Sequence, residues 1–433
     1  MTNKKTLRCA VLLLTLVMAS CDSLEVTDPN APNAADVSVQ SLVSGLEGSL
    51  RTDLFVYIVG MGTLAREVYN LDPADPRWTG ELLTGPLDPG GFVVLRPWGA
   101  RYQAIGNALT LQERATSDLS GAEQSAASGF VSTIVGYQLL LNLNYLGDNG
   151  IKIEFSTDIT VPFVGPDQAY AAIERYLDDG YAQLTQGGAA FPFQLTEGFA
   201  GFDTPASFAQ FNRALRARVA IYQNDFDAAL AALGDSFVNA DGGMDLGVFH
   251  VYSTGSGDML NPLFSVPTAP AVKLRAHPLY GERRMPGDRR FATKILDRSD
   301  DPDFDPAPVV GGGLSSVLVA TVAENATAPL PILRREELLL IRAEANVGKG
   351  NLAAATADVN QVRAAAGLDP ITLTTGNALD VLLHERMYSL FLEGHRLVDV
   401  RRHGRLARLP IDRTTDVVFG EFPRPLDEVP TTN

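Results

Sequence analysis

The residues that could do chemistry in this chain do not gather into a catalytic motif. None of the five histidines stands at the spacing of a metal-ligand pair, and the sequence has no nucleophile elbow, zinc-protease, Walker or dinucleotide-binding motif. Asp301, Asp303 and Asp305 alternate as in a calcium-binding loop, but Pro306 replaces the glycine that such a loop requires, and Gly312 stands where a glutamate is needed. We therefore predict no metal, no cofactor and no enzymatic activity.

One cysteine stands in a setting that gives its thiol a chemical role. A basic start with Lys4, Lys5 and Arg8 precedes the apolar residues 9–19, which are too few to span a bilayer comfortably, and the run ends in Val17-Met18-Ala19-Ser20-Cys21. Small residues followed by cysteine resemble a bacterial lipobox, so we predict that residues 1–20 are a lipoprotein signal peptide and that Cys21 carries acyl chains. An ordinary secretory signal that happens to contain a cysteine is the alternative.

The amino-acid composition of the chain limits the classes of molecule that the protein can bind. The chain has 433 residues, of which 45% are hydrophobic and 20% charged, and this balance is typical of a globular protein. The formal net charge of -16 gives a surface that repels nucleic acid and anionic lipid but accepts neutral ligands such as sugars. The only cysteines are Cys9 and Cys21, so a disulfide framework and a zinc cluster of cysteines are both excluded.

Helical periodicity dominates the elements that must position any site. Residues 352–366 carry apolar side chains at helical spacing, residues 379–391 predict a helix that ends at Gly394, and residues 333–347 predict a third helix. The strongly apolar residues 125–146 predict a buried helix that ends near Gly147. The chain is therefore expected to be all-α.

Two stretches look like copies of one helix–turn–helix unit. Residues 218–230 and 342–355 each place an alanine before a tight polar turn and an alanine pair eight residues later, as in tetratricopeptide-like repeats. We predict a tether over residues 21–36 and a binding domain over 37–433. In this domain, tetratricopeptide-like pairs within about 98–233 and 333–403 form a curved scaffold, and a loop-rich insert over 234–330 packs on it as an irregular layer.

Seven segments, in order along the chain, together resemble the RagB/SusD family of outer-membrane nutrient-binding lipoproteins. The most specific one, Glu385-Arg386 followed by residues 392–402, resembles the family's E-R and E-G-H-R-x-x-D-L-R-R pattern, although Ser389 stands where the family often has a glutamate. The other six segments are residues 98–108, 129–151, 211–230, 334–345, 360–368 and 422–430.

The resemblance implies a function as well as a SusD-like fold. It implies a lipid-anchored protein on the extracellular face of the outer membrane, which binds a glycan or another oligomeric nutrient and docks over a TonB-dependent, SusC-like transporter. The alternative is a tetratricopeptide-like scaffold that grips only other proteins and binds no small ligand.

The charged residues of the most specific segment are expected to be structural. Charge-assisted hydrogen bonds among them would tie the helices together, and nothing in the pattern requires a ligand. These residues are Glu385, Arg386, Glu393, Arg396, Asp399 and Arg402.

The ligand site is sought among flat aromatic side chains and planar polar groups, because sugars stack on the former and hydrogen-bond to the latter. Trp78 lies beside Arg77 in a turn rich in proline and glycine, so we expect its indole near the surface; ordinary loop packing is the alternative. Tyr280 is the second candidate. Trp98 lies on a predicted helix, where core packing is expected.

Overall fold

The computed structural model describes residues 37–156 and 160–429. Chain contacts separate Met1–Ser38 from Val39–Asn433, and every element below lies in the second unit. The signal peptide, Cys21 and the tether lie outside the described residues, so the predictions made for them stay predictions.

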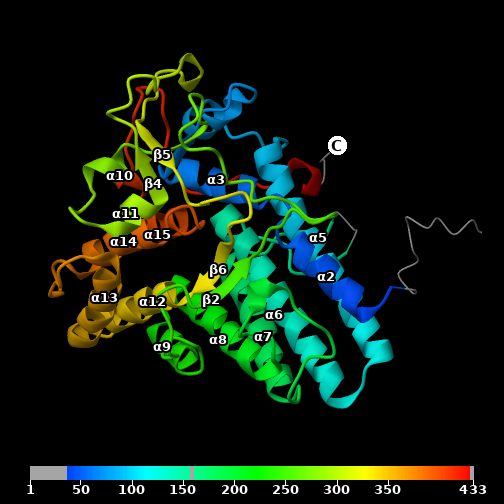
Figure 1. Cartoon of the computed structure of the whole chain (residues 1–433). Helices are drawn as coiled ribbons and strands as arrows, with labels where there is room; N and C mark the ends of the chain where they lie inside the picture. The colour runs from blue at the N-terminus through cyan, green and yellow to red at the C-terminus, as the bar shows by residue number, and fades with distance from the viewer. Residues whose placement is uncertain (1–36, 157–159, 430–433) are drawn as a thin grey trace, which may run out of the picture. The chain divides into compact units, whose positions relative to one another are not determined.

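Helices make up most of the second unit, as expected (Figure 1). A row of helices runs from α5 (Phe92–Asp118) through α6 (Gly121–Leu146) and α7 (Pro166–Thr185), with each helix packed on the next. It continues through α8 (Pro205–Tyr222) and α9 (Phe226–Gly234) to the pair formed by α12 and α13. The remaining long helices are α2 (Val39–Ser49), α3 (Leu54–Leu64), α12 (Arg335–Gly348), α13 (Leu352–Ala366) and α14 (Ala378–Ser389), and the shorter ones are α4 (Glu81–Thr84), α10 (Leu279–Glu282), α11 (Arg289–Lys294) and α15 (Arg396–Arg402).

The two predicted repeat copies are helical pairs, α8 with α9 and α12 with α13. Each pair turns through a residue in the left-handed region, Asn224 (φ 58°) in the first and Gly350 (φ 77°) in the second, and these residue types adopt that conformation most readily. The pairs also touch each other. A Cβ on Gly348 would lie 2.3 Å from the Phe226 ring, so glycine is needed where the end of α12 meets the start of α9.

Helix α6 is the centre of the helical row. It ends at Leu146, next to the predicted Gly147, and 20 of its 26 residues are buried. Among the described residues it is the one helix long and apolar enough to cross a membrane, and 94% of its apolar stretch is buried inside the protein, which is what a core helix requires. A Cβ on Gly129 would lie 2.6 Å from Leu184, so this glycine lets α6 and α7 approach closely.

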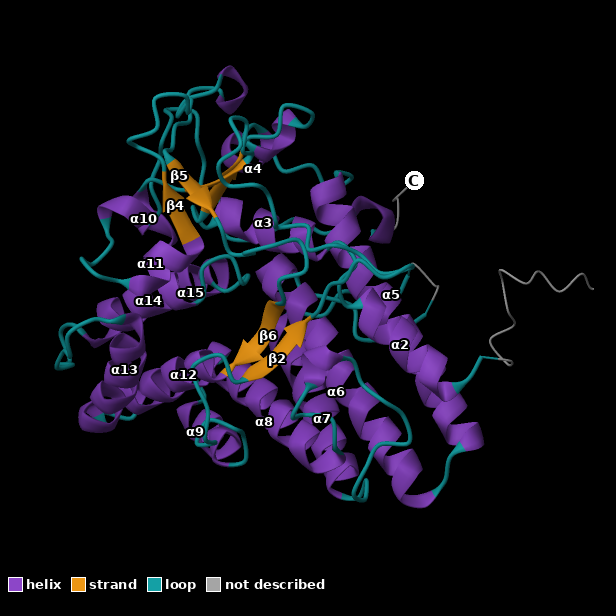
Figure 2. Ribbon diagram, viewed as in Figure 1, coloured by secondary structure: helices purple, strands orange, loops and turns teal. Residues whose placement is uncertain are grey.

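Two small sheets were not predicted. Figure 2 shows them in orange, one within the loop-rich region and one against the helical row. The first has four short antiparallel strands in the order β1-β3-β5-β4, and the second pairs β2 with β6. The strands are β1 (Val68–Asn70), β2 (Gly247–His250), β3 (Leu274–Ala276), β4 (Ile295–Asp297), β5 (Leu318–Ala320) and β6 (Leu330–Arg334). The expected insert over 234–330 therefore contains ordered strands, although loops connect most of them.

Buried ion pairs join the helices, as the charged segment predicted. Arg386 on α14 donates to Asp399 on α15 at 2.7 Å. Arg402 on α15 donates two hydrogen bonds to Glu344 on α12, one of which is 2.7 Å long. Arg218 on α8 forms a two-hydrogen-bond pair with Glu337 on α12 at 2.7 and 2.6 Å.

The other predicted members of the set tie α14, α15 and the turn between them to α13, to the end of β6 and to the end of α3. Glu385 accepts from Arg363 at 2.6 Å, and Glu393 pairs with Arg334 at 2.6 Å. Arg396 donates through Nε to the backbone oxygen of Ala65 at 3.1 Å, at the C-terminal end of α3. All six expected residues therefore bond to the protein itself, and the structural reading of this segment is confirmed.

Candidate functional site

Two adjoining pockets lie beside the N-terminal end of α3, and we call them together the aromatic cleft. Their volumes are about 340 and 420 Å³, and both are lined by Phe55, Asp72 and Pro262. The remaining lining residues are Arg51, Asp53, Leu54, Val56, Asn70, Asp75, Trp78, Phe92, Arg96, Met259, Leu263, Phe264, Ser265, Val266, Ala269, Ala271, Val272, Lys273 and Leu274. Volumes of this size accommodate an extended small ligand.

Three aromatic rings from separate segments build one wall of the cleft. Phe55 lies on α3, Phe92 is the first residue of α5, and Trp78 ends a single 3-10 turn over Pro76–Trp78. The Asp75 side chain accepts from the backbone N–H of Arg77 at 3.2 Å and thereby starts that turn. The Trp78 ring meets Phe55 and Phe92 edge-on, at centroid distances of 6.1 and 5.4 Å.

The expected surface position of Trp78 is wrong. Its side chain is 4% exposed, because Phe55 and Phe92 cover the indole from two sides. Trp78 is nevertheless among the residues that line the cleft, where it packs against Phe55 and Phe92 and supports their rings. Its role in ligand binding stays a prediction, now for an indole that is part of the cleft wall and not a free surface ring.

Arg77, the neighbour of Trp78 in the sequence, lies at the surface. Its side chain is 49% exposed, its guanidinium lies 4.5 Å from the centroid of the Phe92 ring, and it pairs with Asp75 at 2.8 Å. The hydrogen bond from Arg77 lowers the pKa of Asp75, so this carboxylate remains ionised at neutral pH. Arg77 is thus held next to the aromatic wall, and its contact with a ligand stays a prediction.

Paired charges surround the mouth of the cleft. Arg51 donates to Asp258 at 2.6 Å, Lys273 pairs with Asp72 at 3.0 Å, and Arg96 pairs with Asp53. The Arg96 side chain is 55% exposed and keeps donors available to solvent. The loop between β2 and β3 adds exposed apolar side chains, those of Met259, Leu260 and Val266. The cleft therefore combines flat rings with planar polar groups.

Tyr280 is not part of this site. Its side chain is fully buried, its hydroxyl donates to Glu67 Oε1 at 3.2 Å, and its ring packs 4.7 Å from Phe391. Burial raises the pKa of Tyr280 well above its usual value. A ring without exposed surface cannot stack on a ligand, so the expectation of a surface site around Tyr280 is wrong.

Trp98 packs in the core, as expected. It is 3% exposed, its Nε1 donates to Glu428 at 3.1 Å, and its ring stacks on Phe163 at 5.3 Å. His395 is also structural, because its Nδ1 lies 3.0 Å from the Tyr222 hydroxyl in the buried ion-pair region. Over residues 37–156 and 160–429, no three histidine, cysteine or carboxylate side chains gather in a way that could hold a metal ion.

Sequence reasoning missed Phe55, Phe92, Arg51 and Arg96. The cleft joins α3, the start of α5 and the loop that precedes β3, and the sequence gives no sign that these distant segments meet. The one available signal was the turn around Trp78, which lies beside this cleft although its indole is buried.

Comparison with known proteins finds one family model that matches part of the chain and one fold that matches nearly all of it. The model of the SusD family matches residues 319–423. None of the curated proteins searched matches the chain.

Solved structures that resemble the chain cover nearly all of it. A SusD superfamily protein from Bacteroides vulgatus has a TM-score of 0.65 at 14% identity, covering 92% of this chain and 96% of its own. Surface glycan-binding protein A from Bacteroides thetaiotaomicron, in complex with laminarihexaose, has a TM-score of 0.67 at 15% identity and covers 90% and 96%. A laminarin-binding SusD-like protein has a TM-score of 0.65 at 17% identity and also covers 90% and 96%. At these identities the likeness establishes the fold alone.

Proposed function

We propose that this chain is a member of the RagB/SusD family, an outer-membrane lipoprotein that binds an oligomeric nutrient and delivers it to a TonB-dependent, SusC-like transporter. The nutrient is a glycan or another oligomer, and Cys21 carries the lipid anchor on the extracellular face. The protein binds its ligand without converting it.

The aromatic cleft is the observation that carries the proposal. Sugar rings present C–H groups to flat aromatic faces and hydroxyl groups to planar donors and acceptors, and the cleft offers both, in Phe55 and Phe92 and in Arg96 and Asp72. Two structures with this fold are named for binding laminarin or its hexasaccharide, so laminari-oligosaccharides are the first probes.

Calorimetric titration with a panel of glycan and peptide oligomers tests the proposal, together with the variant Arg96→Ala. Arg96 is exposed and, among the described residues, forms an ion pair with Asp53 alone. Its loss should therefore leave the fold intact and weaken ligand binding about two- to tenfold, the effect of one hydrogen bond. Arg175→Ala on α7 is the matched control, because this arginine is exposed and distant in sequence from every cleft segment.

The outcome of the panel also separates the alternatives. A protein that binds no oligomer but retains other proteins in a pull-down would be the tetratricopeptide-like scaffold, and the proposal would be wrong. Sustained release of product from any oligomer, with saturation kinetics, would make the protein an enzyme. Equal affinities of Arg96→Ala and the unmodified protein would place the ligand outside the aromatic cleft.

A further inference from the structure

Four arginines line a second pocket, which we call the arginine pocket. Arg283 follows α10, Arg396 begins α15, and Arg405 and Arg408 follow α15. The only carboxylate in the lining is Asp380 of α14. The lining thus carries four positive charges and one negative charge in a chain whose net charge is -16.

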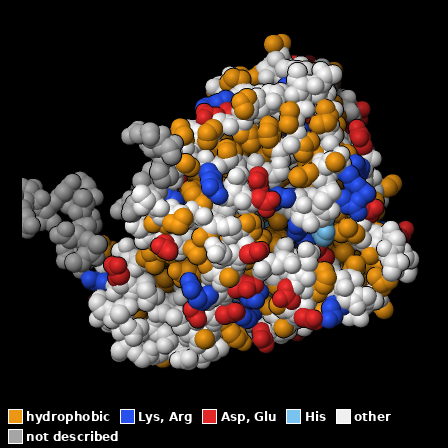
Figure 3. Space-filling model, turned by 180° about the vertical axis from the view of Figure 1, so that it is seen from behind, with side chains coloured by type: hydrophobic (Ala, Val, Ile, Leu, Met, Phe, Trp, Pro, Cys, Tyr) orange, Lys and Arg blue, Asp and Glu red, His pale blue; other side chains and the backbone are white. Residues whose placement is uncertain are grey.

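The surface near α10 and α14 carries basic side chains. Figure 3 shows a group of them near the right-hand edge, on the side where α10 and α14 lie, while acidic and basic side chains are mixed over the lower half of the view. A local concentration of one charge sign in an otherwise acidic protein attracts ligands of the opposite sign.

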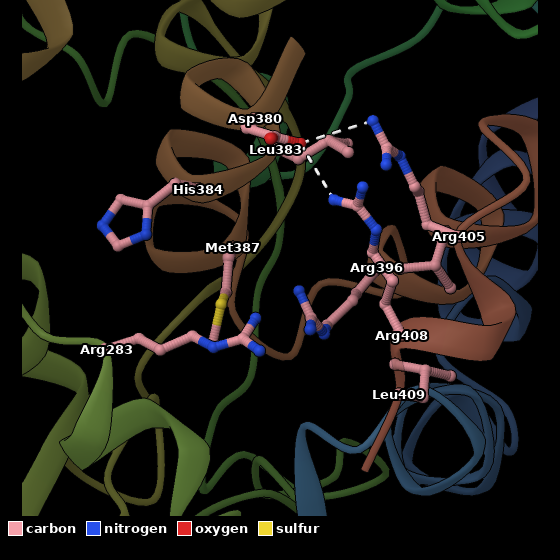
Figure 4. Close-up of a pocket in the computed structure, with 10 residues that line it drawn as sticks. Arg283, Asp380, Leu383, His384, Met387, Arg396, Arg405, Arg408 and Leu409 are labelled. Atoms are coloured by element: carbon pink, nitrogen blue, oxygen red, sulfur yellow. Dashed lines mark hydrogen bonds and ion pairs between the residues drawn. The ribbon is translucent and has the colours of Figure 1, made fainter. Parts of the chain in front are cut away.

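Within the described part of the chain, two of the arginines have no carboxylate within ion-pair distance, although burial raises the pKa of Glu67 to about 7 and the charge of Arg396 partly offsets that rise. Among the described residues, neither Arg283 nor Arg396 has an ion-pair partner, and Arg396 uses only Nε, on the backbone oxygen of Ala65. Arg405 and Arg408 share Asp380, at 3.4 and 3.1 Å. In Figure 4 the guanidinium ends of Arg283 and Arg396 point toward one another across the pocket. Like charges that face each other are unfavourable unless an anion lies between them.

The pocket also limits the size and polarity of what it can hold. Its volume is about 170 Å³, below the roughly 300–1,000 Å³ typical of pockets that bury a drug-sized ligand. Leu383, Met387, Val400 and Leu409 supply the apolar part of the lining. A small ligand with one anionic end and one weakly polar face fits this arrangement, whereas an extended oligomer does not.

We propose that the arginine pocket binds the carboxylate, sulfate or phosphate group of a small ligand such as an acidic sugar. Guanidinium groups bind such oxyanions through paired, charge-assisted hydrogen bonds, and two unpaired arginines that face each other supply both sides of the clamp. The apolar part of the lining receives the C–H face of the ligand. The pocket shares no lining residue with the aromatic cleft, so this site is independent of the proposed nutrient site.

Calorimetric titration with glucuronate, inorganic sulfate, inorganic phosphate and uncharged glucose tests the proposal. Glucuronate should bind and glucose should not, and added salt should weaken the binding. Binding of sulfate or phosphate as tight as that of glucuronate would identify a free anion as the ligand, with the same clamp. If none of the three anions binds, the proposal is wrong.

Three variants locate the binding. Arg283→Gln removes an exposed guanidinium without an ion-pair partner, so the protein should fold normally and lose about tenfold or more in glucuronate affinity. Asp380→Asn should increase the affinity, because it frees Arg405 and Arg408. Arg175→Gln on α7 makes the same change of net charge and should leave the affinity unchanged. Equal losses in Arg283→Gln and Arg175→Gln would show a general charge effect and overturn the proposal, as would unchanged affinity in Arg283→Gln.

Discussion

Replacing Trp78 with alanine should destabilise the protein before it affects any ligand. The indole is 4% exposed and fills the space between Phe55 and Phe92, so the substitution leaves a cavity. Truncation of a buried tryptophan costs about 3–5 kcal/mol in the free energy of unfolding. With an unfolding entropy of roughly 2.1 cal/mol/K per residue over 433 residues, each kcal/mol lowers Tm by about 1 °C, so Tm should fall by about 3–6 °C.

The assay measures Tm by calorimetry and oligomer affinity by titration on the same samples. Trp78→Phe should recover part of the lost stability, because a smaller ring still meets Phe92 edge-on. Arg77→Ala is the matched control next to it in sequence. Its exposed ion pair with Asp75 contributes about 0–1 kcal/mol, so Tm should change by no more than about 1 °C.

An unchanged Tm in Trp78→Ala would refute this reasoning. If that variant also lost its affinity for the oligomer, the indole would be a free stacking surface, and the aromatic wall described above would be wrong.

Three further predictions follow from the buried charges and the N-terminus. Cys21→Ser should release the protein from membranes into the soluble fraction, and a variant that stays membrane-bound would disprove acylation as the anchor. Arg218→Ala leaves Glu337 buried and unpaired and should cost about 3–5 kcal/mol, measured by urea unfolding; a cost below 1 kcal/mol would contradict it. Burial alone would raise the pKa values of Glu344 and Glu393, but their arginine partners outweigh it and hold both at about 2. Because the unfolded values lie near 4.5, Tm should be independent of these two groups above pH 4.5 and fall steeply from there toward pH 2.

The helical part of the fold could be predicted because its signals are local. Helix α13 begins at Leu352 and ends at Ala366, as its apolar spacing indicates. The helix predicted over 379–391 ends earlier, at Ser389, and Leu392 has a left-handed backbone (φ 56°). Leu390, Phe391 and Leu392 are buried in a turn, and apolar character alone does not distinguish a buried turn from a helix.

The sheets and the cleft could not be predicted, because they depend on contacts between distant segments. Strands of three to five residues are too short to show the alternation that identifies a half-buried strand. The burial of Trp78 depends on Phe55 and Phe92, which precede and follow it by more than a dozen residues and belong to different helices. The charged segment was predicted correctly because a buried charge needs a partner wherever the chain places it.

The buried amides of α6 have a consequence for export of the chain. A protein carried by the predicted signal crosses the inner membrane unfolded, and α6 then passes through as a segment apolar enough to remain in the bilayer. Gln138, Asn142 and Asn144 interrupt that segment, and lipid offers an amide no hydrogen-bonding partner. In the folded protein the same side chains are buried in the core. If residues 1–20 direct export as predicted, we expect these amides to favour passage of α6 across the membrane over insertion into it.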